Sequence, residues 1–202
     1  MSFYTATMLC LMILGALLLE TKQSNAEVQC SDAGRIAYEA PMEFCMRTGI
    51  YISAVGVITQ NTPDEFLRFL SKVDRLGFTP AAVTFYSPGG NLFGGVTLGS
   101  IIRERKLHTR VGQNSDCSSA CMIAFIGGRS RKVAHNGSIG NHQLALGADD
   151  RVVQSLIAFV SDYHKRMKVS PLAAKAAMTK TADEMYWYSP QEMSEWGIVT
   201  RR

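Results

Sequence analysis

The chain has 202 residues, of which 47% are apolar and 19% charged, and its formal net charge is +4. Lysine and arginine are scattered apart from a short cluster at Arg129–Lys132, so no basic stripe predicts binding to nucleic acid. The roughly 175 residues that follow an apolar N-terminal segment suit one domain with a sizeable core.

The N-terminal segment has the pattern of an export signal. Met8–Leu19 is an apolar run of 12 residues, which is too short for a membrane-spanning helix of about 20. Ser24-Asn25-Ala26 forms a small-residue cleavage site, although no lysine or arginine precedes the apolar run. We therefore predict that residues 1–26 are a signal peptide and that the mature protein is exported to a bacterial periplasm. An uncleaved anchor is the less favoured alternative, and the segment also predicts transient association with the membrane.

Cleavage leaves an even number of cysteines, which in an exported chain indicates disulfide bonds. The four are Cys30, Cys45, Cys117 and Cys121. Three pairings are open, and the local one joins Cys30 to Cys45 and Cys117 to Cys121. Zinc binding is the rival, but neither pair has the CxxC spacing and no histidine lies beside them at ligand spacing. The sequence therefore predicts neither a metal nor a cofactor.

The arm that follows the signal, residues 27–48, has no clear periodicity, so we expect it to be irregular. The remaining residues, 49–202, are expected to form the domain. A β-branched, apolar strand is predicted over Gly49–Thr59. A helix then begins at Thr62-Pro63, where a capping threonine precedes proline and two acids, and it ends at Gly77.

Strands and helices alternate over most of the remaining chain. Because the alternation is regular from Gly49 to Ala120, we predict an α/β domain with right-handed crossovers and a mainly parallel sheet. The further strands are expected at Ala81–Tyr86, Leu107–Val111, Arg131–Ala134, Ser138–His142 and Met185–Tyr188. The further helices are expected at Phe93–Arg105, Cys117–Ile126, Asp150–Met167 and Pro171–Met178, with a last turn from Ser189 to Gly197.

The segment Ser87-Pro88-Gly89-Gly90 lies between a predicted strand and a predicted helix. Two glycines there let backbone N–H groups point outward, where they can stabilise an oxyanion by about 3 kcal/mol per donor. An ordinary turn is the alternative.

A serine and a histidine complete the pattern. Ser119 opens an apolar helix, where the positive potential of a helix N-terminus favours an alkoxide, although a serine there also serves as a cap. His142 follows a short predicted strand, 23 positions after Ser119.

In this order and spacing, these features resemble the Clp-type serine proteases of the Clp-protease/crotonase superfamily. The likeness is closer to exported relatives with a Cys-x-Ser-Ala-Cys signature, and it runs from about Gly49 to Val199. It rests on Ser87–Gly90, the segment around Ser119, the pair His142-Gln143 and the ending Tyr188–Val199. The resemblance implies a repeated β-β-α spiral fold with a mainly parallel sheet and a protruding long helix.

The resemblance also implies the roles of individual residues in acyl transfer. Ser119 takes the place of the nucleophile and His142 that of the general base. The backbone N–H groups of Gly90 and Ala120 take the places of the oxyanion donors. An acyl-enzyme would form on Ser119, and water would release it.

The third member of the triad is less well defined in the sequence. The family's acid precedes the Tyr-Ser-Pro segment, where Asp183 is the first choice and Glu184 the alternative. An acid that orients the histidine contributes about 10⁴ in rate, so its loss would imply a poor enzyme. A Ser–Lys dyad with Lys180 is a less favoured hypothesis.

The resemblance implies a peptide or protein substrate and a homo-oligomer, with the long helix Asp150–Met167 as a contact arm. Two rivals remain open. The first is a catalytically inactive member of the family that serves as a scaffold or binding protein. The second is a crotonase-type acyl-CoA enzyme, which the signal peptide disfavours.

Overall fold

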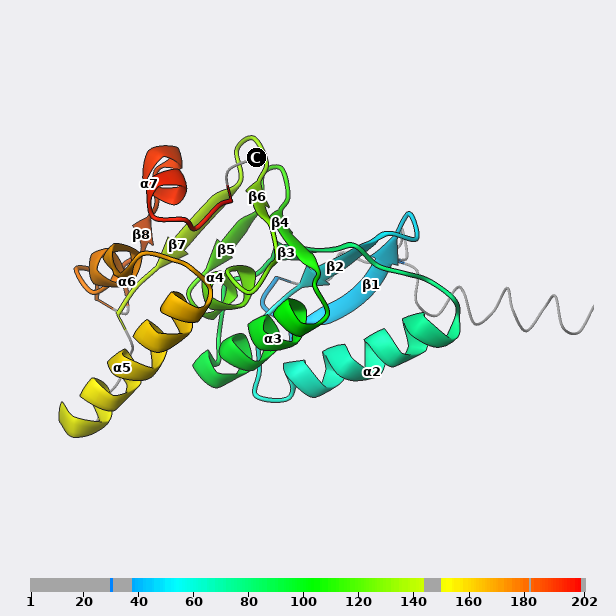
Figure 1. Ribbon diagram of the computed structural model, residues 1–202, viewed down its shortest axis with the longest axis horizontal. Helices are drawn as coiled ribbons and strands as arrows, with labels where there is room; N and C mark the ends of the chain where they lie inside the picture. The colour runs from blue at the N-terminus through cyan, green and yellow to red at the C-terminus, as the bar shows by residue number, and fades with distance from the viewer. Residues whose placement is uncertain (1–29, 31–37, 144–149, 182, 201–202) are drawn as a thin grey trace, which may run out of the picture.

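The computed structural model describes residue 30 and residues 38–143, 150–181 and 183–200 (Figure 1). The predicted signal peptide, residues 1–26, lies outside the described residues. The strands are β1 (Glu43–Arg47), β2 (Tyr51–Val55), β3 (Ala82–Tyr86), β4 (His108–Val111), β5 (Asp116–Ser118), β6 (Arg131–Val133), β7 (Ser138–Asn141) and β8 (Tyr186–Trp187). The helices are α2 (Thr62–Arg75), α3 (Leu92–Glu104), α4 (Ala120–Phe125), α5 (Asp150–Arg166), α6 (Pro171–Ala177) and α7 (Pro190–Glu195).

The larger sheet has five strands in the order β1-β2-β3-β4-β6, and all its pairs are parallel except β1 with β2. Buried apolar residues pair across its centre, whereas Arg110 of β4 is exposed. Ile52 pairs with Val83, and Phe85 pairs with Val111. The expectation of an α/β domain with a mainly parallel sheet is confirmed.

A second sheet joins strands from the second half of the chain in the order β5-β7-β8. β5 and β7 are parallel, with Ser118 opposite Gly140, and β8 is antiparallel to β7. A bridge between Ser87 and Cys117 connects the end of β3 to β5. Because parallel strands end at the same edge of a sheet, the residues after β5 and β7 are brought together.

Helix α4 is the centre of the core, and all six of its residues are buried. It packs against α3, β5 and β7. Two glycines of α3 permit this close approach. A Cβ added at Gly95 would lie 2.6 Å from the Ala120 carbonyl oxygen, and one added at Gly99 would lie 3.1 Å from that of Ala124.

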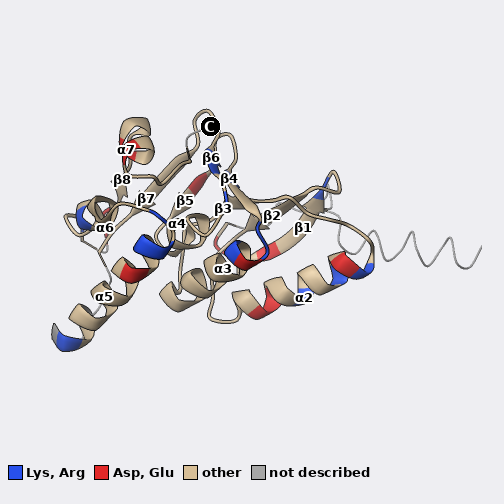
Figure 2. Ribbon diagram, in the orientation of Figure 1, with Lys and Arg blue, Asp and Glu red and all other residues tan. Residues whose placement is uncertain are grey.

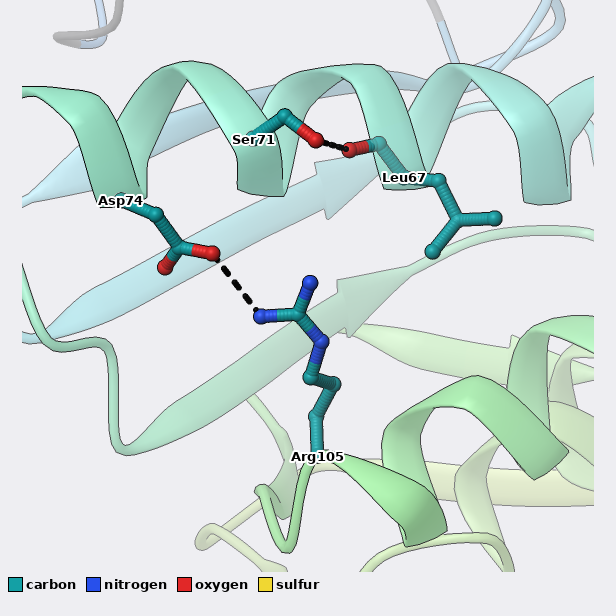
Figure 3. Close-up of polar contacts among 4 residues, drawn as sticks. All are labelled: Leu67, Ser71, Asp74 and Arg105. Carbon is teal, nitrogen blue, oxygen red and sulfur yellow. Dashed lines mark hydrogen bonds and ion pairs between the residues drawn. The ribbon is translucent and has the colours of Figure 1, made fainter.

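Helices α2 and α3 lie side by side against the larger sheet (Figure 1). Figure 3 shows the ion pair at their C-terminal ends, where Arg105 Nη1 lies 2.9 Å from Asp74 Oδ2. Within α2, the Ser71 hydroxyl donates to the Leu67 carbonyl at 2.9 Å. Both charged side chains are about half exposed, so this pair contributes at most about 1 kcal/mol to stability.

Helix α5 projects from the body of the molecule, as the predicted protruding helix should (Figure 1). Acidic and basic residues lie along α2 and α5, whereas buried α4 contains none (Figure 2). Among the described residues, no helix combines the length and apolar character needed to cross a bilayer.

The expectation that residues 27–48 form an irregular arm is wrong at its C-terminal end, where Glu43–Arg47 is strand β1. Within this strand the adjacent residues Cys45 and Met46 are both buried, so β1 lacks the alternation of apolar and polar residues that marks a half-exposed strand. The pairing with β2 fixes this strand, and sequence periodicity does not report such a partner.

The expected capping role of Thr62 is also wrong. The N-cap of α2 is Asn61, and Thr62 is the first residue of the helix. The Thr62 hydroxyl accepts a hydrogen bond from the Thr59 N–H at 2.9 Å, so it holds the preceding turn instead of the helix.

Candidate active site

Ser119 lies on a sharp turn between β5 and α4. Its backbone has φ +54 and ψ −124, which is an uncommon conformation for a residue with a side chain. The Ser119 N–H donates to the Gly140 carbonyl at 2.9 Å, which anchors the turn to β7. The prediction of one helix over Cys117–Ile126 is therefore wrong at its start, because pairing with β7 makes Asp116–Ser118 a strand.

The Ser119 hydroxyl does not cap the helix. Ser119 occupies the N-cap position of α4 but makes no side-chain capping hydrogen bond. A capping serine usually has extended backbone, which this turn does not permit. The side chain is half-buried and lines a cavity, so the hydroxyl is available to a ligand.

The two glycines after β3 lie directly against this turn. A Cβ added at Gly89 would lie 2.7 Å from Ser119 Cβ and 2.9 Å from the Ala120 nitrogen. Gly90 has φ +131, and its own added Cβ would lie 2.2 Å from the Ile58 carbonyl oxygen. Only glycine fits both positions, because any larger residue would separate the two segments.

Two residues that line this cavity have backbone amides with no acceptor among the described residues. Gly90 and Ala120 both line the cavity. Within the described part of the chain, neither amide donates to any group. Unpaired backbone donors near a serine are the groups that an oxyanion hole requires.

His142 directly follows β7, and its imidazole lines the cavity as well. Its Nδ1 lies 2.6 Å from the Gln143 carbonyl oxygen, and its backbone N–H donates to Asn141 Oδ1 at 2.9 Å. A carbonyl oxygen can only accept, so Nδ1 must carry the proton. In the neutral form of the ring this tautomer leaves Nε2 as the acceptor, as a general base requires.

The structure thus brings Ser119, His142, Gly90 and Ala120 to one cavity. The hydrogen bonds of the described residues do not include one between the Ser119 hydroxyl and the His142 ring. Such contacts are often loose before substrate binds and tighten in the complex.

The predicted acids lie on an exposed segment before β8. Asp183 is exposed and has no hydrogen bond or ion pair with a described residue. Glu184 pairs with Lys180, whose Nζ lies 3.7 Å from Glu184 Oε2. In a catalytic triad an acid accepts the hydrogen bond from the histidine Nδ1–H. At His142 the Gln143 carbonyl oxygen accepts this bond instead. The role of Asp183 stays a prediction.

The local disulfide pairing is confirmed. Cys117 bonds to Cys121 across Ser119, and Cys30 bonds to Cys45 at β1. Both sulfurs of the first bridge belong to fully buried residues. This bridge connects β5 to the first turn of α4, so it closes the turn that carries the nucleophile.

The sequence did not predict a group of hydrogen bonds that holds Asp116, at the start of β5. The Tyr38 hydroxyl donates to Asp116 Oδ2, and the Ser118 hydroxyl donates to the same oxygen at 3.4 Å. Burial, together with Asp116, raises the pKa of Tyr38 well above its usual value. The Tyr38 ring also packs on Tyr86, with centroids 4.6 Å apart. No local pattern marks these residues, because 78 positions separate Tyr38 from Asp116.

The cavity has a volume of about 560 Å³, within the range that holds small ligands. Its walls come from α3, α4, α5 and α6, and they are mainly apolar. The side chains that bring polar atoms to it are those of Asn91, Ser119, Asn141, His142, Ser161 and Lys175. Across the described ranges, no group of three or more histidine, cysteine or acidic side chains is placed to hold a metal.

Comparison with known proteins gives a structural likeness only. No protein-family model matches the sequence, and no curated protein matches it. ClpP1 of Listeria monocytogenes is similar in structure with a TM-score of 0.57 at 18% identity, over 75% of this chain and 89% of that one. A variant of the 1510-N membrane-bound stomatin-specific protease, in complex with a substrate peptide, has a TM-score of 0.55 at 20% identity. That match covers 74% of this chain and 71% of the other. Such identities establish the fold, and the chain has a Clp-protease-like fold.

Proposed function

We propose that this chain, which has the fold of the Clp proteases, is an exported serine hydrolase that cleaves peptides. One observation carries the proposal. A strained Ser119 faces the same cavity as two unpaired amides and a histidine whose tautomer is set for base catalysis. The structural likeness to two proteases agrees with this reaction class.

The geometry supports an acyl-enzyme mechanism. His142 Nε2 takes the proton of the Ser119 hydroxyl as its oxygen attacks the peptide carbonyl. The N–H groups of Gly90 and Ala120 stabilise the oxyanion that develops. His142 then gives the proton to the leaving amine, and the C–N bond breaks. Water attacks the ester by the same route and restores the serine.

The hydrogen bond from His142 Nδ1 to the Gln143 carbonyl oxygen supports the proposed reaction in two ways. The carbonyl oxygen accepts a hydrogen bond from Nδ1–H at 2.6 Å, which keeps the ring in one orientation. The same bond stabilises the imidazolium that forms during the reaction. A neutral carbonyl does so less strongly than a carboxylate. A modest turnover number would follow from this difference.

Asp183 is the proposed acid that supplements this carbonyl. It precedes β8, which pairs with β7 just before His142, with Tyr186 opposite Asn141. We expect Asp183→Asn to lower kcat by at least tenfold, whereas Glu184→Gln, which removes a neighbouring charge, leaves kcat unchanged. Steady-state hydrolysis of a fluorogenic peptide measures both. Equal kcat values in Asp183→Asn and the wild type would rule the acid out.

The place of action and the assembly are part of the proposal. The two disulfides suit the oxidising periplasm, and the apolar segment at residues 8–19 suits export. We propose a homo-oligomer, since Clp-type proteases assemble into rings or stacked trimers. Sedimentation of the mature chain tests this, and a monomer at micromolar concentration would exclude it.

A fluorophosphonate probe tests the proposed reaction, because it labels only activated serine hydroxyls. The wild type should react, and Ser119→Ala should not. Ser161→Ala is the matched control, because Ser161 lines the same cavity but belongs to α5, and it should keep the labelling.

The second candidate function is a scaffold that keeps the fold without the reaction. The lack of a bond between Ser119 and His142 among the described residues favours it, as does the exposed Asp183. A wild-type protein that resists the probe, while it remains folded and oligomeric, would establish this alternative.

A further inference from the structure

The cavity extends well beyond the reacting groups. Its far wall is built by α5 and α6, which contribute mainly apolar side chains: Leu156, Ile157, Val160, Ala174, Ala177 and Met178. Two exposed rings, Phe93 and Phe159, contact each other with centroids 5.8 Å apart, and Phe93 also lines the cavity. These walls favour an apolar group of the substrate.

The apolar wall formed by α5 and α6 also contains one basic residue, Lys175. Of the described residues that line the cavity, Lys175 is the only lysine, arginine, aspartate or glutamate. It is the one charged residue of α6, which accounts for the basic segment of that helix in Figure 2.

The position of Lys175 on α6 directs it to the cavity. Pro171, Ala174, Lys175 and Met178 all line the cavity, and their spacing of three and four residues defines one face of a helix. Lys175 therefore belongs to the cavity-facing side of α6. Lys175 is itself exposed, so it lies at the open rim of the cavity, where a charged group of a ligand could reach it.

The ammonium of Lys175 has no partner in the described part of the chain. Lys165 pairs with Asp162 at 3.4 Å, and Lys180 pairs with Glu184 at 3.7 Å, but Lys175 has neither an ion pair nor a hydrogen bond. None of the described residues that line the cavity is an acid that could neutralise it. A cation beside apolar walls attracts an anion more strongly than one in open water, because the walls lower the local dielectric constant.

We propose that Lys175 binds a carboxylate of the substrate while the apolar wall holds the neighbouring side chain. The site would thus select peptides in which a carboxylate lies close to an apolar residue. The carboxylate has two sources, which are the free C-terminus of the peptide and an acidic side chain. This inference rests on the proposed function of the same site, and it adds the substrate class.

Peptide binding to the Ser119→Ala variant tests the inference, because the peptide stays intact. Calorimetry compares one apolar, N-acetylated peptide with a free C-terminus against its C-terminal amide. A second pair, both amidated, carries glutamate or glutamine beside the apolar residue. The free acid, the glutamate peptide or both should bind about tenfold tighter than the neutral counterpart, and the pair that shows the difference identifies the source.

Substitution of the lysine connects this preference to one residue. In the same Ser119→Ala background, Lys175→Met should abolish the preference for the carboxylate peptide, and Lys175→Arg should retain it. Lys165→Met removes a cation of α5 that does not line the cavity, so it should keep the full preference.

Equal binding of charged and neutral peptides in both pairs would overturn the inference, as would a preference that survives Lys175→Met. Failure of the proposed function has a different signature, which is the lack of fluorophosphonate labelling in a folded wild type. The binding result needs no hydrolysis, so the two failures are distinguishable.

Discussion

At the scale of single residues, the site depends on how closely Gly90 approaches its neighbours. Its amide is free among the described residues, and its backbone has φ +131. An added Cβ would lie only 2.2 Å from the Ile58 carbonyl oxygen, so a side chain there must displace the backbone. The displaced amide would then miss the oxyanion, because a donor acts over hydrogen-bond distance only.

We predict that Gly90→Ala lowers kcat by about 10²–10³, the usual cost of one oxyanion donor. Gly77→Ala is the matched control, because Gly77 also has positive φ (+77) but no atom lies within 4 Å of the added Cβ. The control should lose stability and keep the kcat of the wild type, measured on a fluorogenic peptide. Similar losses of kcat in the two variants would contradict the oxyanion role.

At the scale of secondary-structure elements, the junction of β5 and α4 holds the nucleophile. The Cys117–Cys121 bridge spans this junction with a sequence separation of 4, and the Cys30–Cys45 bridge closes a separation of 15. Chain entropy alone gives about 2 kcal/mol for the short loop and about 3 kcal/mol for the long one. The short bridge is therefore the weaker contributor to stability, but it lies at the site.

Removal of each bridge separates the two effects. We predict that Cys117→Ala with Cys121→Ala lowers kcat by tenfold or more, because the Ser119 turn loses its brace. Cys30→Ala with Cys45→Ala should lower the midpoint of urea unfolding and leave kcat unchanged. The prediction fails if removal of the short bridge leaves kcat at the wild-type value while the protein remains folded.

At the scale of the whole molecule, Arg131 joins three helix ends. Its buried guanidinium donates to carbonyl oxygens after α4, α5 and α7, at distances from 2.8 to 3.3 Å: Ile126, Gly128, Met167, Gly197 and Ile198. Burial lowers the pKa of Arg131 to about 10. Helix C-termini carry partial negative charge, so the cation is stabilised there without a carboxylate.

We predict that Arg131→Met lowers the free energy of unfolding by about 3 kcal/mol, because several buried carbonyls lose their donor. The exposed Arg129→Met should change it by less than about 0.5 kcal/mol. Urea titration of the two variants measures both values. A change below about 1 kcal/mol in Arg131→Met would show that water replaces the guanidinium at these carbonyls.

Local sequence patterns predicted the features that depend on residues close together in the chain. The turn Ser87–Gly90 and the alternation of strands and helices were visible in the sequence, and the structure bears them out. Of the three cysteine pairings that the sequence left open, the structure has the local one. Strands β1 and β5 were not predicted, because each exists through pairing with a distant partner. The Gln143 carbonyl at His142 was also missed, since a backbone acceptor leaves no signal in residue type.

The central claim is that Ser119 is a nucleophile that His142 activates. Peptide mass mapping after treatment with a fluorophosphonate tests it most directly, because it identifies the residue that carries the adduct. We predict a single adduct on Ser119 in the wild type and a rate of labelling at least 100-fold lower in His142→Ala. An adduct on any other serine, or an unchanged rate in His142→Ala, would contradict the claim.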